Sequence, residues 1–270
     1  HKGLLHDSGM HVPLMVRFPE KWKHLAPAEA GGTVDRLVTF VDFAPTVLSL
    51  AGLEVPKAMQ GQIFLGPKAA PEAEYVYGFR DRVDEVFDLS GSIRSKDYLY
   101  IRNYLPHLSW AQPSVYSDQG AIQQEIFRHA AANADSLTQP QKAYVAPTRP
   151  VEEFYDVNAD PQNLVNLLEG DLNDAQKTAL EAHRAAFVKK RMEILDLGVL
   201  PESLMVSFIV DENRPLREIA EGKSSHRPDL EKIWATADLV GKGERADLLE
   251  LARDGDAGVR FWAILALREA

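Results

Sequence analysis

The first two residues of the chain, His1 and Lys2, are the first candidates for chemistry. Lys2 is followed by a glycine, then by a turn signal at Asp7-Ser8-Gly9, and then by an apolar run from Val12 to Phe18. This order can hold an ammonium group at the mouth of a sheet, where it could stabilise negative charge. The alternative for both residues is an ordinary solvated surface position, which the spacing does not exclude.

Other common catalytic motifs are absent from the sequence. The eight histidines include no HExxH motif and no pair at the helical spacing of metal ligands. There is no GxSxG, no Walker loop and no GxGxxG. The chain has no cysteine, which excludes disulfides, cysteine-ligated zinc and a cysteine nucleophile within it. The residues by themselves therefore predict no metal site in this chain.

The composition is that of a soluble globular protein with a sizeable core. The 270 residues are 45% hydrophobic and 26% charged. No apolar run approaches the ~18 to 20 residues of a membrane-spanning helix. The net charge of −10 comes from 30 basic and 40 acidic residues, without a dense Lys/Arg block. Nucleic acid is therefore not expected as a partner.

The elements that must position these residues follow from hydrophobic patterning. The run from Val12 to Phe18 predicts a buried strand that ends at Pro19. A helix is expected to begin near Pro45 and to end at Gly52.

From Glu74 the pattern predicts an antiparallel meander. Its strands lie in EYVYGF, SIRS and DYLYIRNY, and Ser95-Lys96-Asp97 forms a tight connection between the last two. Residues 106–150 are expected to form a long, irregular surface excursion. VEEFYDV predicts a further strand, and a strong helix is expected from Asn173 to Leu195, capped by Asn173 or Asp174.

Beyond Gly198 the chain is predicted to be a separate helical unit. PLREIAEG, RPDLEKIWATADLVG and ERADLLELARDGDAGVRFWAILALRE are three helical blocks, and the last divides into two helices at DGDAG. The segment DGDAGVRFWAILAL resembles a HEAT-type repeat, and an ordinary helical hairpin is the alternative. Since the chain begins at His1 and ends directly after a helical run, we expect it to be an internal piece of a longer protein.

A family resemblance gives these blocks a common context. The segment HKGLLHDSGMHVPLMVRFPEKW resembles the stretch that follows the metal-binding Asp-Asn or Asp-His in type I sulfatases. Five more blocks follow in the family's order and bring the resemblance to residues 1–195: VTFVDFAPTVLSLAGLEVPKAMQG, EYVYGFRDRVDE, SIRSKDYLYIRNYLPHLSWAQ, EEFYDVNADPQNLVNLL and the helix after it. The RDRVDE and IRNYLPH blocks are most similar to bacterial N-sulfoglucosamine sulfohydrolase-like, heparan-type sulfatases.

The resemblance implies an α/β chain of alkaline-phosphatase-like fold in three parts. Residues 1–70 would be the end of the large mixed-sheet catalytic domain, residues 71–197 a small antiparallel sheet with a packed helix, and residues 198–270 a helical, HEAT-like extension. The family works with a formylglycine nucleophile and a calcium ion, whose residues would precede His1. No Cys-x-Pro-x-Arg or Ser-x-Pro-x-Arg run occurs here. The piece alone is therefore expected to be inactive, and the full protein to be periplasmic or secreted.

The resemblance also implies roles for particular residues. Lys2 matches the family's sulfate-contacting lysine, and His1 could contact the same group or the leaving atom. Arg80 and Arg82, after one strand, and His107, after another, are candidates to bind the anionic groups of a sulfated carbohydrate such as a glycosaminoglycan. The alternative is that the arginines form surface ion pairs with Asp81, Asp84 or Glu85. His11 stands where many relatives have an arginine, which leaves its role open.

The predicted function is hydrolysis of sulfate esters or sulfamates by the full-length enzyme. A phosphoesterase or phosphonate hydrolase of the same superfamily is the rival enzyme, and a non-catalytic binding module built on the tail is the rival of another class. The sequence does not indicate the sugar, the linkage or the oligomeric state.

Overall fold

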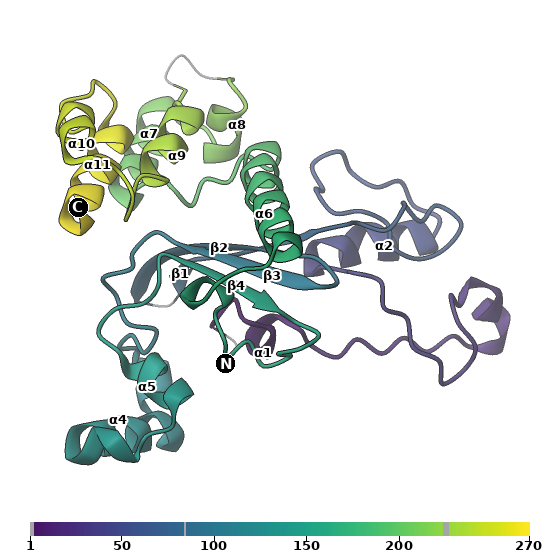
Figure 1. Cartoon of the computed structure of the whole chain (residues 1–270). Coiled ribbons are helices and arrows are strands. Elements are labelled where there is room, and N and C mark those ends of the chain that lie inside the picture. The colour runs from purple at the N-terminus through teal and green to yellow at the C-terminus, as the bar shows by residue number, and fades with distance from the viewer. Residues whose placement is uncertain (1–2, 84, 224–226) are drawn as a thin grey trace.

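A four-stranded antiparallel sheet is the centre of the computed structural model, which describes residues 3–83, 85–223 and 227–270 (Figure 1). Its strands are β1 (Val76–Val83), β2 (Val86–Arg94), β3 (Tyr98–Asn103) and β4 (Glu152–Asp156), paired in that order. The predicted meander is confirmed, and Ser95–Asp97 is the tight link between β2 and β3. The strand predicted around SIRS is longer than expected, because it pairs along both neighbours.

Helix α6 (Asp174–Glu193) covers one face of the sheet and confirms the predicted long helix. The Asn173 side chain accepts a hydrogen bond from the backbone N–H of Gln176, in a capping box that satisfies donors at the helix start. Phe187 of α6 stacks on Tyr77 of β1 at 5.5 Å between ring centroids and meets Tyr100 of β3 edge-on at 5.8 Å. Aromatic packing therefore fixes α6 on the sheet.

The C-terminal helices continue the core that α6 begins. They are α7 (Glu202–Glu212), α8 (Leu216–Ala220), α9 (Leu230–Ala237), α10 (Arg245–Leu251) and α11 (Ala257–Glu269). Trp234 and Trp262 are fully buried against Tyr104, and their indole N–H groups donate to the carbonyls of Asp196 and Val199. The predicted helical blocks, including the division of the last one, are confirmed. The HEAT-like assignment and the domain boundaries stay predictions.

The N-terminal segment lies on the opposite face of the sheet (Figure 1). Leu5 and the short helix α1 (Asp7–Met10) are held there, and Leu5 is buried with Leu99, Ile101, Tyr155 and Val157. The sheet therefore separates α6 and the tail from the start of the chain.

The prediction of a buried strand from Val12 to Phe18 is wrong. Residues 11–19 have no regular secondary structure, and the Met15 side chain is 92% exposed. A strand needs a neighbour to satisfy its backbone groups, and no strand in the described part of the chain pairs with this run. The helix predicted from Pro45 to Gly52 is confirmed as α2 (Phe43–Leu50), with Gly52 at φ 74° after its end. Short 3-10 helices lie at Glu20–Leu25 and Phe40–Asp42.

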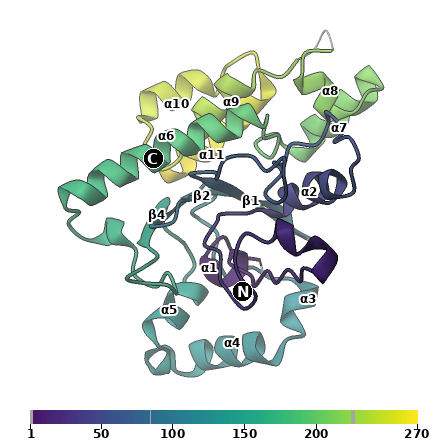
Figure 2. The same cartoon turned by 90° about the vertical axis from the view of Figure 1, so that its right-hand side faces the viewer.

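The prediction that residues 106–150 are irregular is also wrong. They contain α3 (Val115–Asp118), α4 (Ala121–Asn133), a 3-10 turn at Ala134–Ser136 and α5 (Gln139–Val145). The sequence AIQQEIFRHAAAN of α4 is rich in residues that favour helices, and a Thr138–Gln141 capping box starts α5. In Figure 2 these helices lie at the bottom of the molecule, beyond α1. A last 3-10 turn, Leu167–Glu169, precedes α6.

The chain is thus an α/β protein with a small antiparallel sheet, a helix packed on it and an all-α tail, as predicted. Among the described residues, no helix has both the length and the apolar character needed to cross a membrane.

Candidate functional site

A cavity of about 260 Å³ lies where the N-terminal segment meets the end of β1. One side is formed by Gly3, Leu4, Leu5 and Met10, and the other by Phe79 to Arg82. The predicted residues Arg80 and Arg82 therefore share a cavity with the residue that follows Lys2. His1 and Lys2 themselves lie outside the described residues.

Because of a β-bulge between them, Arg80 and Arg82 have different neighbours. The pairing of β1 with β2 shifts register between Arg80 and Arg82, so the regular alternation of faces is broken there. The Nε of Arg80 lies 3.4 Å from a carboxylate oxygen of Asp88, which is fully buried. Arg82 instead donates to the carbonyl of Leu200 at 2.7 Å, at the start of the helical tail.

Arg82 forms the ion pair considered as the alternative to its binding role. Its Nη1 lies 3.2 Å from a carboxylate oxygen of Asp81, and its Nε lies 3.8 Å from one of Glu202. The Arg82 side chain remains partly exposed at the cavity, at 22%. An anion that enters the cavity would therefore compete with the carboxylates of Asp81 and Glu202 for this guanidinium.

Arg80 belongs to a buried cluster of charged side chains centred on Asp88. Asp88 accepts hydrogen bonds from both Nη atoms of Arg149 and from the Gln112 amide. The Arg149 guanidinium also lies over the Trp110 ring, at 4.6 Å from its centroid. One carboxylate thus faces two guanidinium groups, which leaves an excess of positive charge beside the cavity. Burial lowers the pKa of Arg80, although Asp88 opposes this effect.

A second buried network holds His6, four residues after Lys2 in the chain. The His6 ring lies edge-on to Trp110 and Tyr155, and its Nε2 is 3.1 Å from a carboxylate oxygen of Glu153. Glu153 also accepts from the Tyr155 hydroxyl at 2.5 Å and from the Asn103 amide at 2.6 Å. Burial, together with the adjacent Glu153, raises the pKa of Tyr155, so this hydroxyl stays a donor.

The Asp7-Ser8-Gly9 turn is fixed to the sheet by a two-point ion pair. Arg94 lies at the end of β2, and its Nε and Nη2 donate to the two different carboxylate oxygens of Asp7, each at 3.1 Å. The backbone N–H of Asp7 donates to the side chain of Asn163 at 2.7 Å. His11 is 76% exposed and lies 4.0 Å from Asp7. The antiparallel sheet thereby determines where the segment after Lys2 lies.

His107 is not part of this cavity. Its Nδ1 lies 3.2 Å from a carboxylate oxygen of Glu269, near the end of α11, and burial together with Arg268 lowers its pKa. The structure brings Arg80 and Arg82 to the same cavity and does not bring His107 to it.

Sequence reasoning missed the residues of the two buried networks, above all His6, Asp88, Arg149 and Glu153. Asp88 and Arg149 are 61 residues apart in the chain and His6 and Glu153 are 147 apart, so no local motif marks these pairs. A carboxylate at an otherwise apolar strand position, as in EEFYDV and FDLS, was the one available signal. Within the ranges described by the structure, no group of three or more His, Cys, Asp or Glu could hold a metal ion.

Comparison with known proteins gives these features a family context. Residues 1–129 match the family model described as N-sulphoglucosamine sulphohydrolase, C-terminal. An ulvan-active sulfatase from Formosa agariphila is 34% identical over 206 residues, which are 76% of this chain and 33% of that protein. A second ulvan-active sulfatase from the same organism is 26% identical over 81% of this chain and 42% of its own length. The chain thus spans about a third to two fifths of these relatives.

Solved structures with similar segments include a 2-O GAG sulfatase, at 21% identity and a TM-score of 0.38. That match covers 61% of this chain and 27% of the other. A protein solved with its substrate D-glucosamine-2-N,6-O-disulfate matches at 18% identity and a TM-score of 0.34, over 58% of this chain and 24% of the other. Since both TM-scores are below 0.5, the fold given above rests on the elements of this chain alone.

Proposed function

Because this chain carries the C-terminal portion of a sulfatase, we propose that the longer protein hydrolyses sulfate esters or sulfamates of sulfated carbohydrates. The family resemblance predicted from the sequence is confirmed by the family match and by the relatives. The observation that carries the proposal is the cavity shared by Gly3, directly after Lys2, and by Arg80 and Arg82 of β1. Arg80 and Arg82, with Asp81 between them in the sequence, would offer positive charge to an anionic substrate at this cavity.

Lys2 is the residue that we propose to contact the sulfuryl group. Cleavage of a sulfate ester or sulfamate builds negative charge on the sulfuryl oxygens and on the leaving oxygen or nitrogen. A fixed ammonium group stabilises this charge more in the transition state than in the bound substrate, and so it raises turnover. His1 would contact the same group or the leaving atom.

Arg80 and Arg82 would bind anionic groups of the saccharide away from the reacting bond. The single charge of Asp88 is shared between Arg80 and Arg149, so Arg80 retains positive charge for a ligand. Arg82 would exchange its contact with Asp81 for a sulfate or carboxylate of the substrate. His107, paired with Glu269, would contribute only to a saccharide that extends as far as α11.

The nucleophile and the metal ion would come from outside this chain. From the resemblance to type I sulfatases we expect the longer protein to supply a formylglycine and calcium ligands. The proposal includes secretion or export to the periplasm, in line with the bacterial source of the relatives.

The test is to assay the purified full-length protein with a sulfated polysaccharide, a small aryl sulfate and an aryl phosphate. We expect release of inorganic sulfate from the first two and no phosphate release above the blank. Preferential hydrolysis of the aryl phosphate would contradict the proposal and favour a phosphoesterase. A protein that binds the polysaccharide and hydrolyses none of the three would be a binding module.

A further inference from the structure

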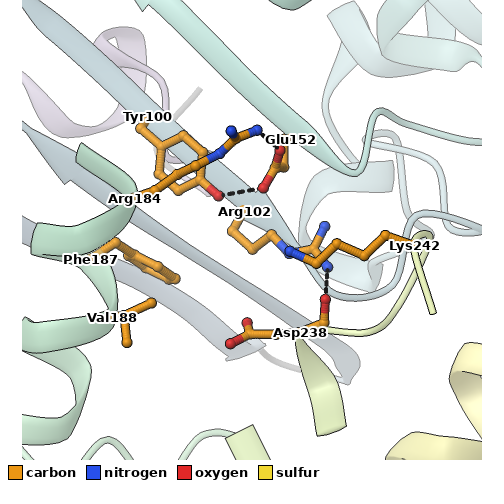
Figure 3. Close-up of a pocket in the computed structure, with 8 residues that line it drawn as sticks. All are labelled: Tyr100, Arg102, Glu152, Arg184, Phe187, Val188, Asp238 and Lys242. Atoms are coloured by element: carbon orange, nitrogen blue, oxygen red, sulfur yellow. Dashed lines mark hydrogen bonds and ion pairs between the residues drawn. The ribbon is translucent and has the colours of Figure 1, made fainter. Parts of the chain in front are cut away.

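A second, smaller cavity lies on the other face of the sheet, where β3, β4, α6 and the turn between α9 and α10 meet (Figure 3). Its volume is about 90 Å³, enough for about three water molecules. Charged side chains provide most of its wall: Arg102, Glu152, Arg184, Asp238 and Lys242, beside Tyr100, Phe187 and Val188. The cavity is too small for a sugar ring with its substituents and large enough for one small ion.

The two carboxylates at this cavity already have partners. Glu152 accepts a hydrogen bond from the Tyr100 hydroxyl at 2.9 Å and forms an ion pair with Arg184. The Asp238 carboxylate pairs with Arg191 of α6 and accepts from the Tyr104 hydroxyl. Neither carboxylate therefore compensates the charge of Arg102 or Lys242 by direct contact.

Arg102 is a buried cation that is bound only to neutral groups. It is 2% exposed, and it donates to the carbonyls of Val151, Asp238 and Val240. These bonds use three of its five N–H donors. Its Nε is buried and has no hydrogen-bond partner among the described residues. Because buried charges are ordinarily paired, a guanidinium that meets no carboxylate is a candidate to bind an anion.

Lys242, an exposed residue, is the second cation at this cavity that forms no direct ion pair. Its side chain extends from the α9–α10 turn across the cavity and places its ammonium group beside Arg102 (Figure 3). The two carboxylates of the cavity wall, Glu152 and Asp238, form their ion pairs with Arg184 and Arg191. Burial and the adjacent Arg102 lower the pKa of Lys242, although Glu152 and Asp238 oppose this effect.

Two glycines allow the turn that carries Lys242 to pack closely against its neighbours. Gly241 has a φ of 76°, and a side chain there would overlap Val151, because its Cβ would lie 2.6 Å from the valine side chain. A Cβ at Gly243 would crowd Leu239 and Leu248. The turn therefore packs directly on the residue before β4, so Lys242 is presented to the cavity by a fixed backbone.

From this arrangement we propose that Arg102 and Lys242 form a binding site for one small oxyanion, such as sulfate or phosphate or a sulfate group on a ligand. The anion would accept hydrogen bonds from the Lys242 ammonium and from a free N–H of Arg102. It would neutralise charge at the junction of the sheet, α6 and the tail, and so stabilise the docking of the tail. The site is separate from the cavity at Arg80 and does not depend on hydrolase activity.

Titration calorimetry of this chain with sodium sulfate and with sodium phosphate, in chloride buffer of constant ionic strength, tests the proposal. We expect one anion per chain, and Lys242→Gln should weaken binding by about tenfold or more, because it removes a charged hydrogen bond. Lys242→Arg should retain most of the affinity. The control is Lys68→Gln, which removes the same charge from an exposed lysine outside the cavity wall and should leave binding unchanged. Arg102 is unsuitable for substitution, because it holds three carbonyls.

A sulfated monosaccharide distinguishes the two sources of the anion. Tighter binding of glucose 6-sulfate than of inorganic sulfate assigns the site to a sulfate group on a carbohydrate, whereas equal or weaker binding assigns it to the free ion. Absence of one-to-one binding of any of these anions would overturn the proposal, and so would binding that Lys242→Gln leaves unchanged. Thermal unfolding in the presence of sulfate is a second test. Since sulfate also raises Tm nonspecifically, only a larger increase in Tm for the wild type than for Lys242→Gln counts as support.

Discussion

The buried carboxylate Asp88 offers the sharpest test of how the Arg80 cavity is supported. Asp88 and its partner Arg149 are both fully buried, and Arg80 is only 10% exposed. Asp88→Asn keeps the volume of the side chain and an oxygen that can accept the hydrogen bond from the Leu89 backbone N–H. The substitution removes the charge, and its amide NH2 then faces donors of Arg149 and Gln112 that the second carboxylate oxygen had accepted.

The expected loss of stability follows from this burial. When one partner of a buried ion pair is removed, the other charge remains without compensation, at a cost of about 3 to 5 kcal/mol. Here two arginines lose their common counterion, so we expect a value at the upper end of that range. For a protein of this size, each kcal/mol lowers Tm by about 2 to 4 °C, which predicts a decrease of roughly 10 to 20 °C.

The measurements are thermal unfolding followed by circular dichroism, which gives Tm, and urea unfolding, in which the slope of the transition is compared between wild type and variant. Glu125→Gln is the control, because Glu125 pairs with Arg128 and His129 on the exposed surface of α4 and should leave Tm unchanged. Replacement of both partners, as Asp88→Leu with Arg149→Met, should recover part of the loss. A change in Tm of less than about 3 °C for Asp88→Asn would refute this account of the cluster.

Further predictions concern activity and pH. The 270-residue chain alone should show no turnover of an aryl sulfate above a buffer blank; measurable turnover would mean that the chain contains its own nucleophile. In the full-length protein, Lys2→Ala should lower kcat by about 10²-fold at an unchanged Tm. An unchanged kcat would mean that Lys2 is an ordinary surface lysine without a catalytic role. Arg82→Gln should raise KM for a polyanionic saccharide far more than for an aryl sulfate, since only the saccharide reaches the cavity wall; equal effects would argue against a binding role. Burial lowers the pKa of His183 below 6.5, so the unfolded chain takes up its proton first and stability should fall as pH drops below about 6.5. His183→Gln should reduce this slope in Tm measured from pH 7.5 to 5, and an unchanged slope would exclude His183 as its source.

The sequence by itself determined the elements whose signals are local. Short runs that contain aromatic or aliphatic residues marked β1, β3 and β4, because such residues favour strands. Asn173, placed before a helical period, located the start of α6, because its side chain satisfies a donor of its own first turn. The order of blocks along residues 1–195 also gave the family, which the comparisons confirm.

Only the tertiary structure decided the elements and contacts that depend on distant partners. The run from Val12 to Phe18 has the residues of a strand, yet it lacks a paired neighbour in the described structure and stays irregular. Residues 106–150 showed the opposite error, because their five prolines suggested irregular chain whereas the segments between them form helices.

For the candidate site too, the sequence indicated some residues and the tertiary structure determined their contacts. Strand ends pointed to Arg80 and Arg82, but a one-residue bulge sends Arg80 to Asp88 and Arg82 to Leu200. The positions of such side chains are determined by register and by partners that fold next to them, such as Glu153, which lies 147 residues from His6. Local patterns record the preference of a residue for helix or strand, whereas a buried charge is placed by whichever opposite charge the folded chain brings beside it.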